Sequence, residues 1–116
     1  MQNNKINYIE LPAAKLDATK TFFKQTFGWG FVDYGSEYSA FENAGLDGGF
    51  FHSEKSSNTK DGSALVVLYS DDLEGIKETI VENGGTIVQN IFSFPGGRRF
   101  HFSDPSNNEF AVWSDK

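Results

Sequence analysis

Two side chains in the sequence are candidates for acid–base chemistry near neutral pH, one carboxylate and one imidazole. The carboxylate, Glu10, shares one face of an expected strand with Tyr8, while Ile9 and Leu11 share the other face. Because the apolar face must pack on a core, Glu10 is expected to point into a cleft. There it would act as a general base or anchor a ligand, or it would serve as a structural hydrogen-bond acceptor for the backbone or an arginine.

The imidazole, His101, lies between Phe100 and Phe102 on a second expected strand. If the two phenylalanines pack beneath helices, His101 points into the cleft; if they line the cleft, His101 is a structural group. Arg98 and Arg99 come just before it, after a glycine turn. Their guanidinium groups could bind the carboxylate of an anionic ligand at the mouth of the cleft, or they could form ion pairs on the surface.

Aromatic residues are abundant, with 12 phenylalanines, 4 tyrosines and 2 tryptophans. Most of these rings must fill the core, but Tyr8, Tyr69 and Trp113 occupy strand positions on the cleft side. They would form an aromatic floor that suits a flat or apolar small molecule. The predicted catalytic residues are Glu10 and His101, and the predicted ligand-binding residues are Tyr8, Glu10, Tyr69, His101 and Trp113.

Composition excludes several classes of partner and location. The 116 residues suffice for one domain, and 16 acidic against 10 basic residues give a net charge of −6, which opposes binding to nucleic acid. The sequence has no cysteine, hence no disulfide or thiolate chemistry, and its first residues lack the pattern of a signal peptide, so a cytoplasmic location is expected. The longest apolar run, residues 64–69, is far shorter than the roughly 20 residues that span a membrane.

The elements that position these residues are duplicated. Residues 10–28 and 67–85 share one layout: an apolar strand, a polar break, an amphipathic helix and a glycine turn. The anchor pairs Leu16/Leu73 and Gly28/Gly85 have the same offset of 57 residues. Two copies are too few for a solenoid, so we expect two modules around one shared core, with the functional site in the cleft between them.

Each copy is predicted to contain a strand, a helix and three further strands. In the first copy the strand ends at Pro12 and the helix ends at Gly28; in the second, Asp71 or Asp72 caps the helix and Gly84–Gly85 ends it. The second helix should bury Leu73, Ile76, Ile80 and Val81. The predicted strands are residues 6–11, 29–33, 38–42, 49–52, 64–68, 86–92, 98–102 and 109–113, the helices begin at residues 15 and 72, and residues 54–62 form an exposed linker.

Four segments resemble the vicinal oxygen chelate superfamily, which includes glyoxalase I, the bleomycin-resistance proteins and the extradiol dioxygenases. They are Tyr8-Ile9-Glu10-Leu11-Pro12, Phe22-Phe23 with Phe27-Gly28-Trp29, Asn83-Gly84-Gly85, and Phe102-Ser103-Asp104-Pro105-Ser106-Asn107-Asn108. The resemblance implies an α+β fold in which two βαβββ modules pair into an incomplete curved β-barrel with a central cleft. One domain over residues 1–116 would then comprise module 1 at about 5–53, the linker at about 54–62 and module 2 at about 63–114.

The resemblance also implies where a divalent metal would be held, and this sequence departs from that pattern. Metal-dependent relatives carry His on the first strand, Glu or His on the fourth, His on the fifth and Glu on the eighth. Tyr8, Leu65 and Ala111 fall at the first, third and last of these positions, and such side chains cannot supply a converging ligand set. We therefore predict no metal and no cofactor. His52, near the fourth position, is either one ligand of a reduced site or a surface histidine at a strand end.

Two functions from different classes follow. The first is a metal-free protein of the glyoxalase/bleomycin-resistance type that binds a small molecule in the barrel cleft. The alternative is a glyoxalase-like lyase or isomerase that uses Glu10 and His101 as acid–base groups, with or without a reduced metal site; a weaker third is a regulatory or interaction module. Relatives commonly form homodimers, so a homodimer is compatible with this chain, although both modules are already present in it.

Overall fold

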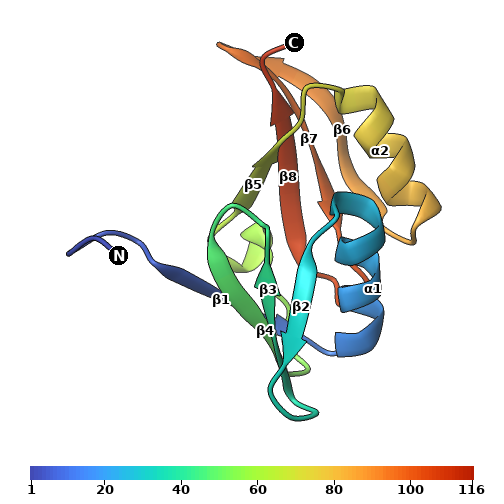
Figure 1. The fold of residues 1–116 in the computed structure, drawn as a ribbon. Helices are drawn as coiled ribbons and strands as arrows, with labels where there is room; N and C mark the ends of the chain where they lie inside the picture. The colour runs from blue at the N-terminus through green and yellow to red at the C-terminus, as the bar shows by residue number, and fades with distance from the viewer.

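Two copies of one β-α-β-β-β unit follow one another along the chain in the computed structural model, which describes residues 1–116 (Figure 1). The first copy contains β1 (Tyr8–Ala13), α1 (Leu16–Phe27), β2 (Gly30–Asp33), β3 (Tyr38–Glu42) and β4 (Asp47–His52). The second contains β5 (Val66–Tyr69), α2 (Leu73–Glu82), β6 (Thr86–Phe94), β7 (Gly97–Ser103) and β8 (Glu109–Ser114). A single 3₁₀ turn, Thr59–Asp61, lies in the linker. The duplicated layout predicted from the sequence is therefore confirmed.

The two copies form two separate four-stranded sheets with equivalent strand orders, β1-β4-β3-β2 and β5-β8-β7-β6. In each sheet the first strand runs parallel to the last, and the other pairs are antiparallel. This leaves β1 and β5 as edge strands, and the sheets are not closed into a barrel. Each sheet has an outer face covered by helices and an inner face turned away from them (Figure 1).

Pro12 lies inside β1, so the prediction that it ends the strand was wrong. Proline cannot donate a backbone hydrogen bond, and it is therefore confined to edge strands. β1 is such a strand, since it pairs with β4 alone. The predicted helix stop at Gly28 is confirmed, because this residue takes the left-handed conformation with φ 75° and donates its N–H to the carbonyl of Lys24.

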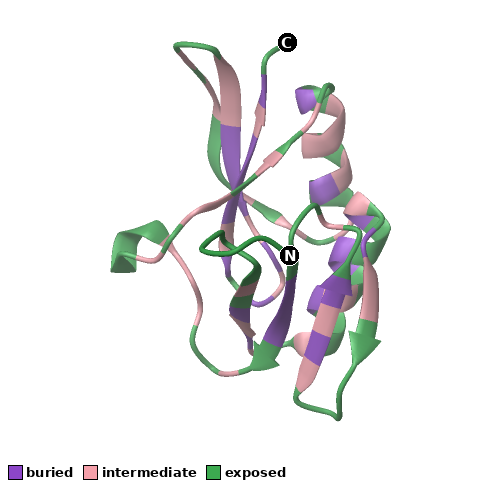
Figure 2. Cartoon of the chain, turned by 60° about the vertical axis from the view of Figure 1, so that its left-hand side comes forward, coloured by how far each residue is buried: buried purple, intermediate pink, exposed green.

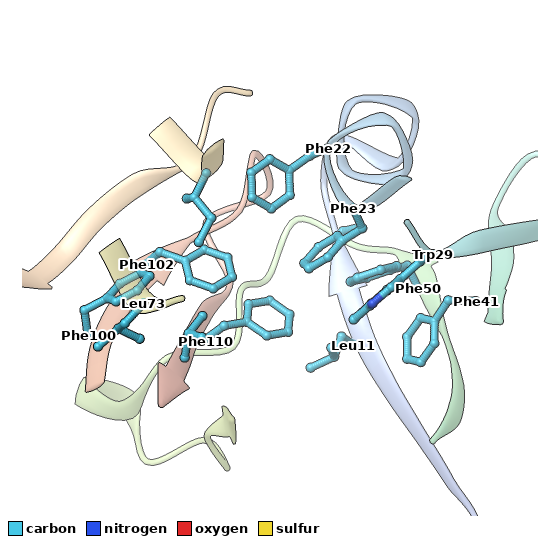
Figure 3. Close-up of a cluster of buried hydrophobic side chains, with 13 residues drawn as sticks. Leu11, Phe22, Phe23, Trp29, Phe41, Phe50, Leu73, Phe100, Phe102 and Phe110 are labelled. Atoms are coloured by element: carbon cyan, nitrogen blue, oxygen red, sulfur yellow. The ribbon is translucent and has the colours of Figure 1, made fainter. Parts of the chain in front are cut away.

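One aromatic core lies between the helices and the outer faces of both sheets (Figures 2 and 3). Phe23 of α1 stacks on Trp29 at 4.5 Å and also meets Phe110 of the second module at 5.1 Å. Phe22 of α1 lies 5.9 Å from Phe102 of β7. The first helix therefore packs on both sheets, and the two modules share a single core, as the duplication predicts.

The second helix buries less than its sequence pattern predicts. Leu73 and Ile80 are buried and Ile76 is half-buried, but Val81 is 54% exposed. Residues in a helix are separated by about 100°, which places Val81 about 80° from Leu73 around the axis and outside the packed face. Neither helix of the structure is long and apolar enough to cross a lipid bilayer.

A turn between β7 and β8 ties the modules together. The Asp104 carboxylate accepts backbone N–H groups from Ser106 and Asn108, each at 2.9 Å. Asn108 donates its side-chain amide to the carbonyl of Pro12 at 2.7 Å, and the Ser106 hydroxyl bonds that of Thr19 in α1 at 2.6 Å. The turn of the second module thus holds both the first strand and the first helix of the other module.

Candidate binding site on the inner sheet faces

The inner face of the first sheet carries a tyrosine pair beside a carboxylate. The hydroxyls of Tyr8 and Tyr38 share a hydrogen bond of 2.5 Å. Burial raises the pKa of the Tyr38 hydroxyl well above its usual value, and the neighbouring Tyr8 and Glu10 add to the rise. Gly49 lies beneath this pair, where a Cβ would collide with the Tyr38 ring. Glu10 itself is exposed, so the structure places it at the open surface of the face rather than in an enclosed cleft.

The inner face of the second sheet carries a buried imidazole–carboxylate pair. His101 is only 6% exposed, and its Nδ1 lies 2.7 Å from Oε2 of Glu109. The other carboxylate oxygen accepts hydrogen bonds from the backbone N–H and the hydroxyl of Thr59, at 2.9 and 2.8 Å. Phe100 and Phe102 are fully buried on the outer face, so His101 points to the inner face. This is the first of the two orientations that the sequence left open.

The hydrogen bonds around Glu109 determine its charge state. Burial alone would raise the pKa of Glu109, but the hydrogen bonds from His101 and Thr59 outweigh it and hold that pKa below its usual value. An ionised Glu109 accepts the Nδ1 proton of His101, and this leaves Nε2 of the ring directed away from the pair. A histidine held in this way by a carboxylate can accept or donate a proton at Nε2.

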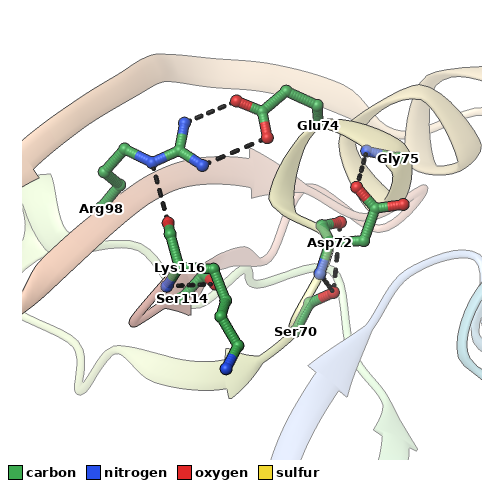
Figure 4. A network of polar contacts seen from close by, with 7 residues as sticks. All are labelled: Ser70, Asp72, Glu74, Gly75, Arg98, Ser114 and Lys116. Carbon is green, nitrogen blue, oxygen red and sulfur yellow. Dashed lines mark hydrogen bonds and ion pairs between the residues drawn. The ribbon is translucent and has the colours of Figure 1, made fainter.

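The two neighbouring arginines of β7 have different surroundings. Arg98 faces α2 and forms two hydrogen bonds with Glu74, at 2.5 and 3.2 Å (Figure 4). Arg99 is on the inner face, where its guanidinium carbon lies 5.3 Å from the ring centre of Phe92 and 5.9 Å from that of Phe94. These distances are within the range of cation–π attraction. Of the two functions considered for this pair, Arg98 forms the surface ion pair and Arg99 belongs to the inner face.

A row of aromatic rings crosses the same face beside Arg99. The Trp113 ring lies 5.2 Å from that of Tyr69, at a steep angle, and 6.4 Å from that of Phe94. Arg99 is the strand partner of Trp113, so the cation and the row are adjacent. The hydroxyl of Tyr69 donates to Asp115 at 2.5 Å, which holds the exposed ring in place.

The predicted site residues are therefore divided between the two sheets. Tyr8 and Glu10 lie on the first sheet, whereas Tyr69, His101 and Trp113 lie on the second. No hydrogen bond joins the two sets within one chain. Sequence reasoning did not assign roles to Tyr38, Thr59 or Glu109. Strand alternation already put Glu109 on the face of Trp113, so pairing that strand with the one that holds His101 would have found it.

The largest cavity is elsewhere, between the edge strands β1 and β5. It measures about 490 Å³ and is lined almost entirely by apolar side chains, among them Ile9, Trp29 and Phe41. Of the predicted site residues only Tyr69 borders it. Its lining lacks the convergent polar groups that a specific ligand site needs in addition to apolar walls.

The residues at the metal-binding positions that the resemblance implies do not form a set of metal ligands within one chain. No three histidine, aspartate or glutamate side chains come together anywhere in the structure. His52 lies on the strand face of buried Phe50, opposite the inner face; it is exposed and its Nδ1 is 3.5 Å from Glu37. Ala111 is fully buried beside His101 and supplies no ligand atom. Three or four converging donors are required, and Glu109 with His101 provides only two.

Comparison with known proteins agrees with this architecture. The structure resembles the fosfomycin resistance protein FosX from Listeria monocytogenes, with 18% identity, coverage of 97% of this chain and 94% of that chain, and a TM-score of 0.79. It also resembles lactoylglutathione lyase from Agrobacterium tumefaciens, with 20% identity, coverage of 97% and 95%, and a TM-score of 0.72. It also resembles a glyoxalase/bleomycin resistance protein/dioxygenase family enzyme from Burkholderia phytofirmans PsJN. Here the identity is 14%, the coverage is 95% of this chain and 98% of that chain, and the TM-score is 0.80.

These identities are low, so the three structures establish the fold and not an activity. Among curated proteins, none matches the sequence. A family model, by contrast, matches residues 5–112, which is nearly the whole chain. The chain therefore belongs to the glyoxalase/bleomycin resistance protein/dioxygenase superfamily.

Proposed function

We propose that this protein binds a small molecule on the inner faces of its sheets. One observation supports this most strongly: the inner face of the second sheet carries aromatic rings and a cation beside a carboxylate-held imidazole, and neither α1 nor α2 covers it (Figure 1). Rings provide contact area at little entropic cost, and the polar groups fix the orientation of a ligand.

We further propose that two chains associate and cover the inner faces. The exposed side chains include Tyr8, Phe51 and Tyr69, all of them on inner faces. The accessible surface of the chain is 6920 Å², whereas a compact monomer of this mass exposes about 6300 Å². In a symmetric pair, the inner face of the first sheet of one chain could meet the inner face of the second sheet of the other. Glu10 and His101 would then line one cleft.

The chain contains two tryptophans, which makes the location of the site directly testable. Trp113 lies on the inner face, whereas Trp29 borders the apolar cavity between β1 and β5. Compounds that raise the melting temperature in a metabolite screen would be titrated while tryptophan fluorescence is recorded. We expect Trp113→Phe to abolish the fluorescence change and Trp29→Phe to retain it.

The opposite pattern would place the ligand in the apolar cavity and contradict the proposal. Sedimentation equilibrium on the same samples would measure the association of two chains. A monomer at every concentration, with ligand present, would contradict the proposed dimer.

A second candidate function is an acid–base enzyme, a lyase or an isomerase, and the pair formed by His101 and Glu109 supports it. A buried imidazole with one nitrogen fixed by a carboxylate is suited to moving a proton at the other nitrogen. Glu10 would contribute only across a dimer, because it lies on the other sheet. Turnover of a ligand found in the screen, with loss of kcat in His101→Gln, would favour the enzyme over the binding protein.

The remaining predictions rest on composition. We propose a cytoplasmic location from the cysteine-free sequence, no nucleic-acid partner from its negative charge, and no membrane partner from the lack of a long apolar run. The absence of a cofactor stays a prediction as well.

A further inference from the structure

Only two buried side-chain nitrogen or oxygen atoms in the chain have no hydrogen-bond partner, and they are neighbours. They are Nε of Arg99 and Nε2 of His101, on the same face of β7 and two residues apart. Alternate residues of a strand are separated by about 7 Å. Buried polar atoms are almost always paired, so two unpaired nitrogens at this spacing indicate a missing acceptor.

The charge at this position favours an anion as the missing partner. Arg99 has no carboxylate partner although the chain carries 16 acidic residues, and the adjacent Arg98 does have one in Glu74. The ring centres of Phe92 and Phe94 lie 5.3 and 5.9 Å from the Arg99 guanidinium carbon, and Nε of Arg99 is buried. An arginine that is partly desolvated and unpaired binds a carboxylate strongly, through two parallel hydrogen bonds.

His101 can complete the contact to an anion. Because ionised Glu109 accepts the Nδ1 proton, a second proton on Nε2 gives an imidazolium that Glu109 already neutralises. An oxyanion between Arg99 and His101 would stabilise that second proton. Binding of the anion should therefore favour protonation of Nε2.

The surroundings of the two nitrogens suggest the rest of the ligand. Trp113 pairs with Arg99 across the strands, and its ring continues to Tyr69 on one side and Phe94 on the other. Such a row suits a flat aromatic body. A net charge of −6 disfavours ligands with two or more negative charges.

We propose that this face binds the carboxylate of a flat aromatic acid, with Arg99 and His101 on the carboxylate and Trp113 and Tyr69 against the ring system. This proposal rests on the proposed function and adds the chemical class of the ligand. It differs from that function in requiring a negative charge, so the two can fail separately.

The test compares 2-naphthoate with 2-naphthamide, which has nearly the same shape and no charge. In isothermal titration calorimetry at low salt, we expect naphthoate to bind and naphthamide to bind at least tenfold more weakly, because the amide forms no ion pair with Arg99. Arg99→Gln should weaken naphthoate at least tenfold. Arg98→Gln, which removes an equal charge from the next residue, should leave its affinity within about twofold.

Two further measurements keep the result independent of misfolding. Arg99→Lys retains the charge but not the two-pronged geometry, and it should bind with intermediate affinity while its melting temperature stays near that of the native chain. Titrations in buffers of different ionisation enthalpy should reveal proton uptake with naphthoate, and His101→Asn should abolish that uptake.

Several outcomes would overturn the proposal. They are failure of naphthoate to bind, equal binding of acid and amide, equal losses in the Arg98 and Arg99 variants, and displacement of naphthoate by inorganic phosphate at comparable concentration. If neutral compounds from the screen still change Trp113 fluorescence, the proposed function survives and only the anionic ligand is rejected. If no compound does, both are rejected.

Discussion

At the scale of single residues, the orientation of His101 depends on a residue of the linker. Thr59 binds one oxygen of Glu109 through both its N–H and its hydroxyl, and the other oxygen is left for the imidazole. A carboxylate held at both oxygens cannot rotate freely, so the ring is fixed in one position. The linker was predicted as an exposed connection; Thr59 is exposed, and its hydrogen bonds to Glu109 also support the candidate site.

Replacing Thr59 with valine tests this support. The variant loses the hydroxyl and keeps the shape and the backbone N–H, so we expect a loss of about 1 kcal/mol in unfolding free energy. The pKa of Glu109 should rise toward its usual value, because a hydrogen bond to the ionised form has been removed. Urea denaturation and carboxyl-carbon NMR titration would measure the two effects. Thr86→Val, at an exposed strand position, is the control, and an equal loss there would refute the role of the Thr59 hydroxyl.

Strand alternation was enough to predict which residues turn inward, but not what they touch. The faces of Glu10, His101 and Trp113 follow from a period of two residues. The contacts of His101 depend on the pairing of β7 with β8 and on the path of the linker, and local sequence specifies neither. Tyr38 was missed for the same reason, since it meets Tyr8 only because β4 lies between their strands.

At the scale of elements, the turn formed by residues 104–108 depends on a residue in an uncommon backbone conformation. Asn107 adopts φ 66° in this turn. Asparagine is among the few side chains that tolerate this left-handed conformation. Asn107 therefore suits the turn, and with it the hydrogen bonds of Asp104 and Asn108 that connect the modules.

The same turn should give the protein a distinctive pH dependence. Burial raises the pKa of Asp104 to about 6, from an ordinary value of 3.8, although hydrogen bonds from Asn108 and Ser106 favour the ionised form. Between these two values the folded state binds more protons than the unfolded state, so the unfolding free energy falls as the pH rises from 4 to 6, by at most about 3 kcal/mol.

Asp104→Asn should remove this slope, and Asp71→Asn, at an exposed position, should keep it. Denaturant unfolding at several pH values between 4 and 7 measures the slope independently of the absolute stability of each variant. Parallel curves for the native chain and the Asp104 variant would contradict the raised pKa.

Helix ends and glycine turns were predicted from sequence to within a few residues, because their chemistry is local. The ends and the register of long strands were harder to predict from the sequence. β6 extends to Phe94, two residues beyond the prediction, and its pairing with β7 shifts register twice between Ile87 and Phe92. Such irregularities bend a strand to follow the sheet, and they depend on its neighbours rather than on its own pattern.

At the scale of the whole molecule, the duplication was enough to predict the fold. It did not predict the open arrangement of the two sheets. A repeat at a constant offset indicates two equivalent modules and one core. Whether two inner faces meet within one chain or between two chains depends on the angle between the sheets, to which the linker and the turn at residues 104–108 contribute. The expected incomplete barrel is present as two open sheets.

The lack of a converging ligand set leads to a prediction for the intact protein. Titration with zinc, nickel or manganese after removal of bound metal should leave the melting temperature unchanged, because no three donors meet to stabilise the folded state. Differential scanning fluorimetry with elemental analysis would check this. A saturable rise with one metal per chain would contradict it and would require donors from two chains.

The core of packed phenylalanine rings has a chemical consequence as well as a structural one. The chain has no cysteine, and its single sulfur atom belongs to Met1, which is fully exposed. Peroxide attacks thiolates and thioethers first, and sulfoxide formation disrupts cores by making an apolar side chain polar. The interior of this protein therefore contains no sulfur that peroxide could oxidise. We expect oxidation at Met1 to leave the packing of the core intact.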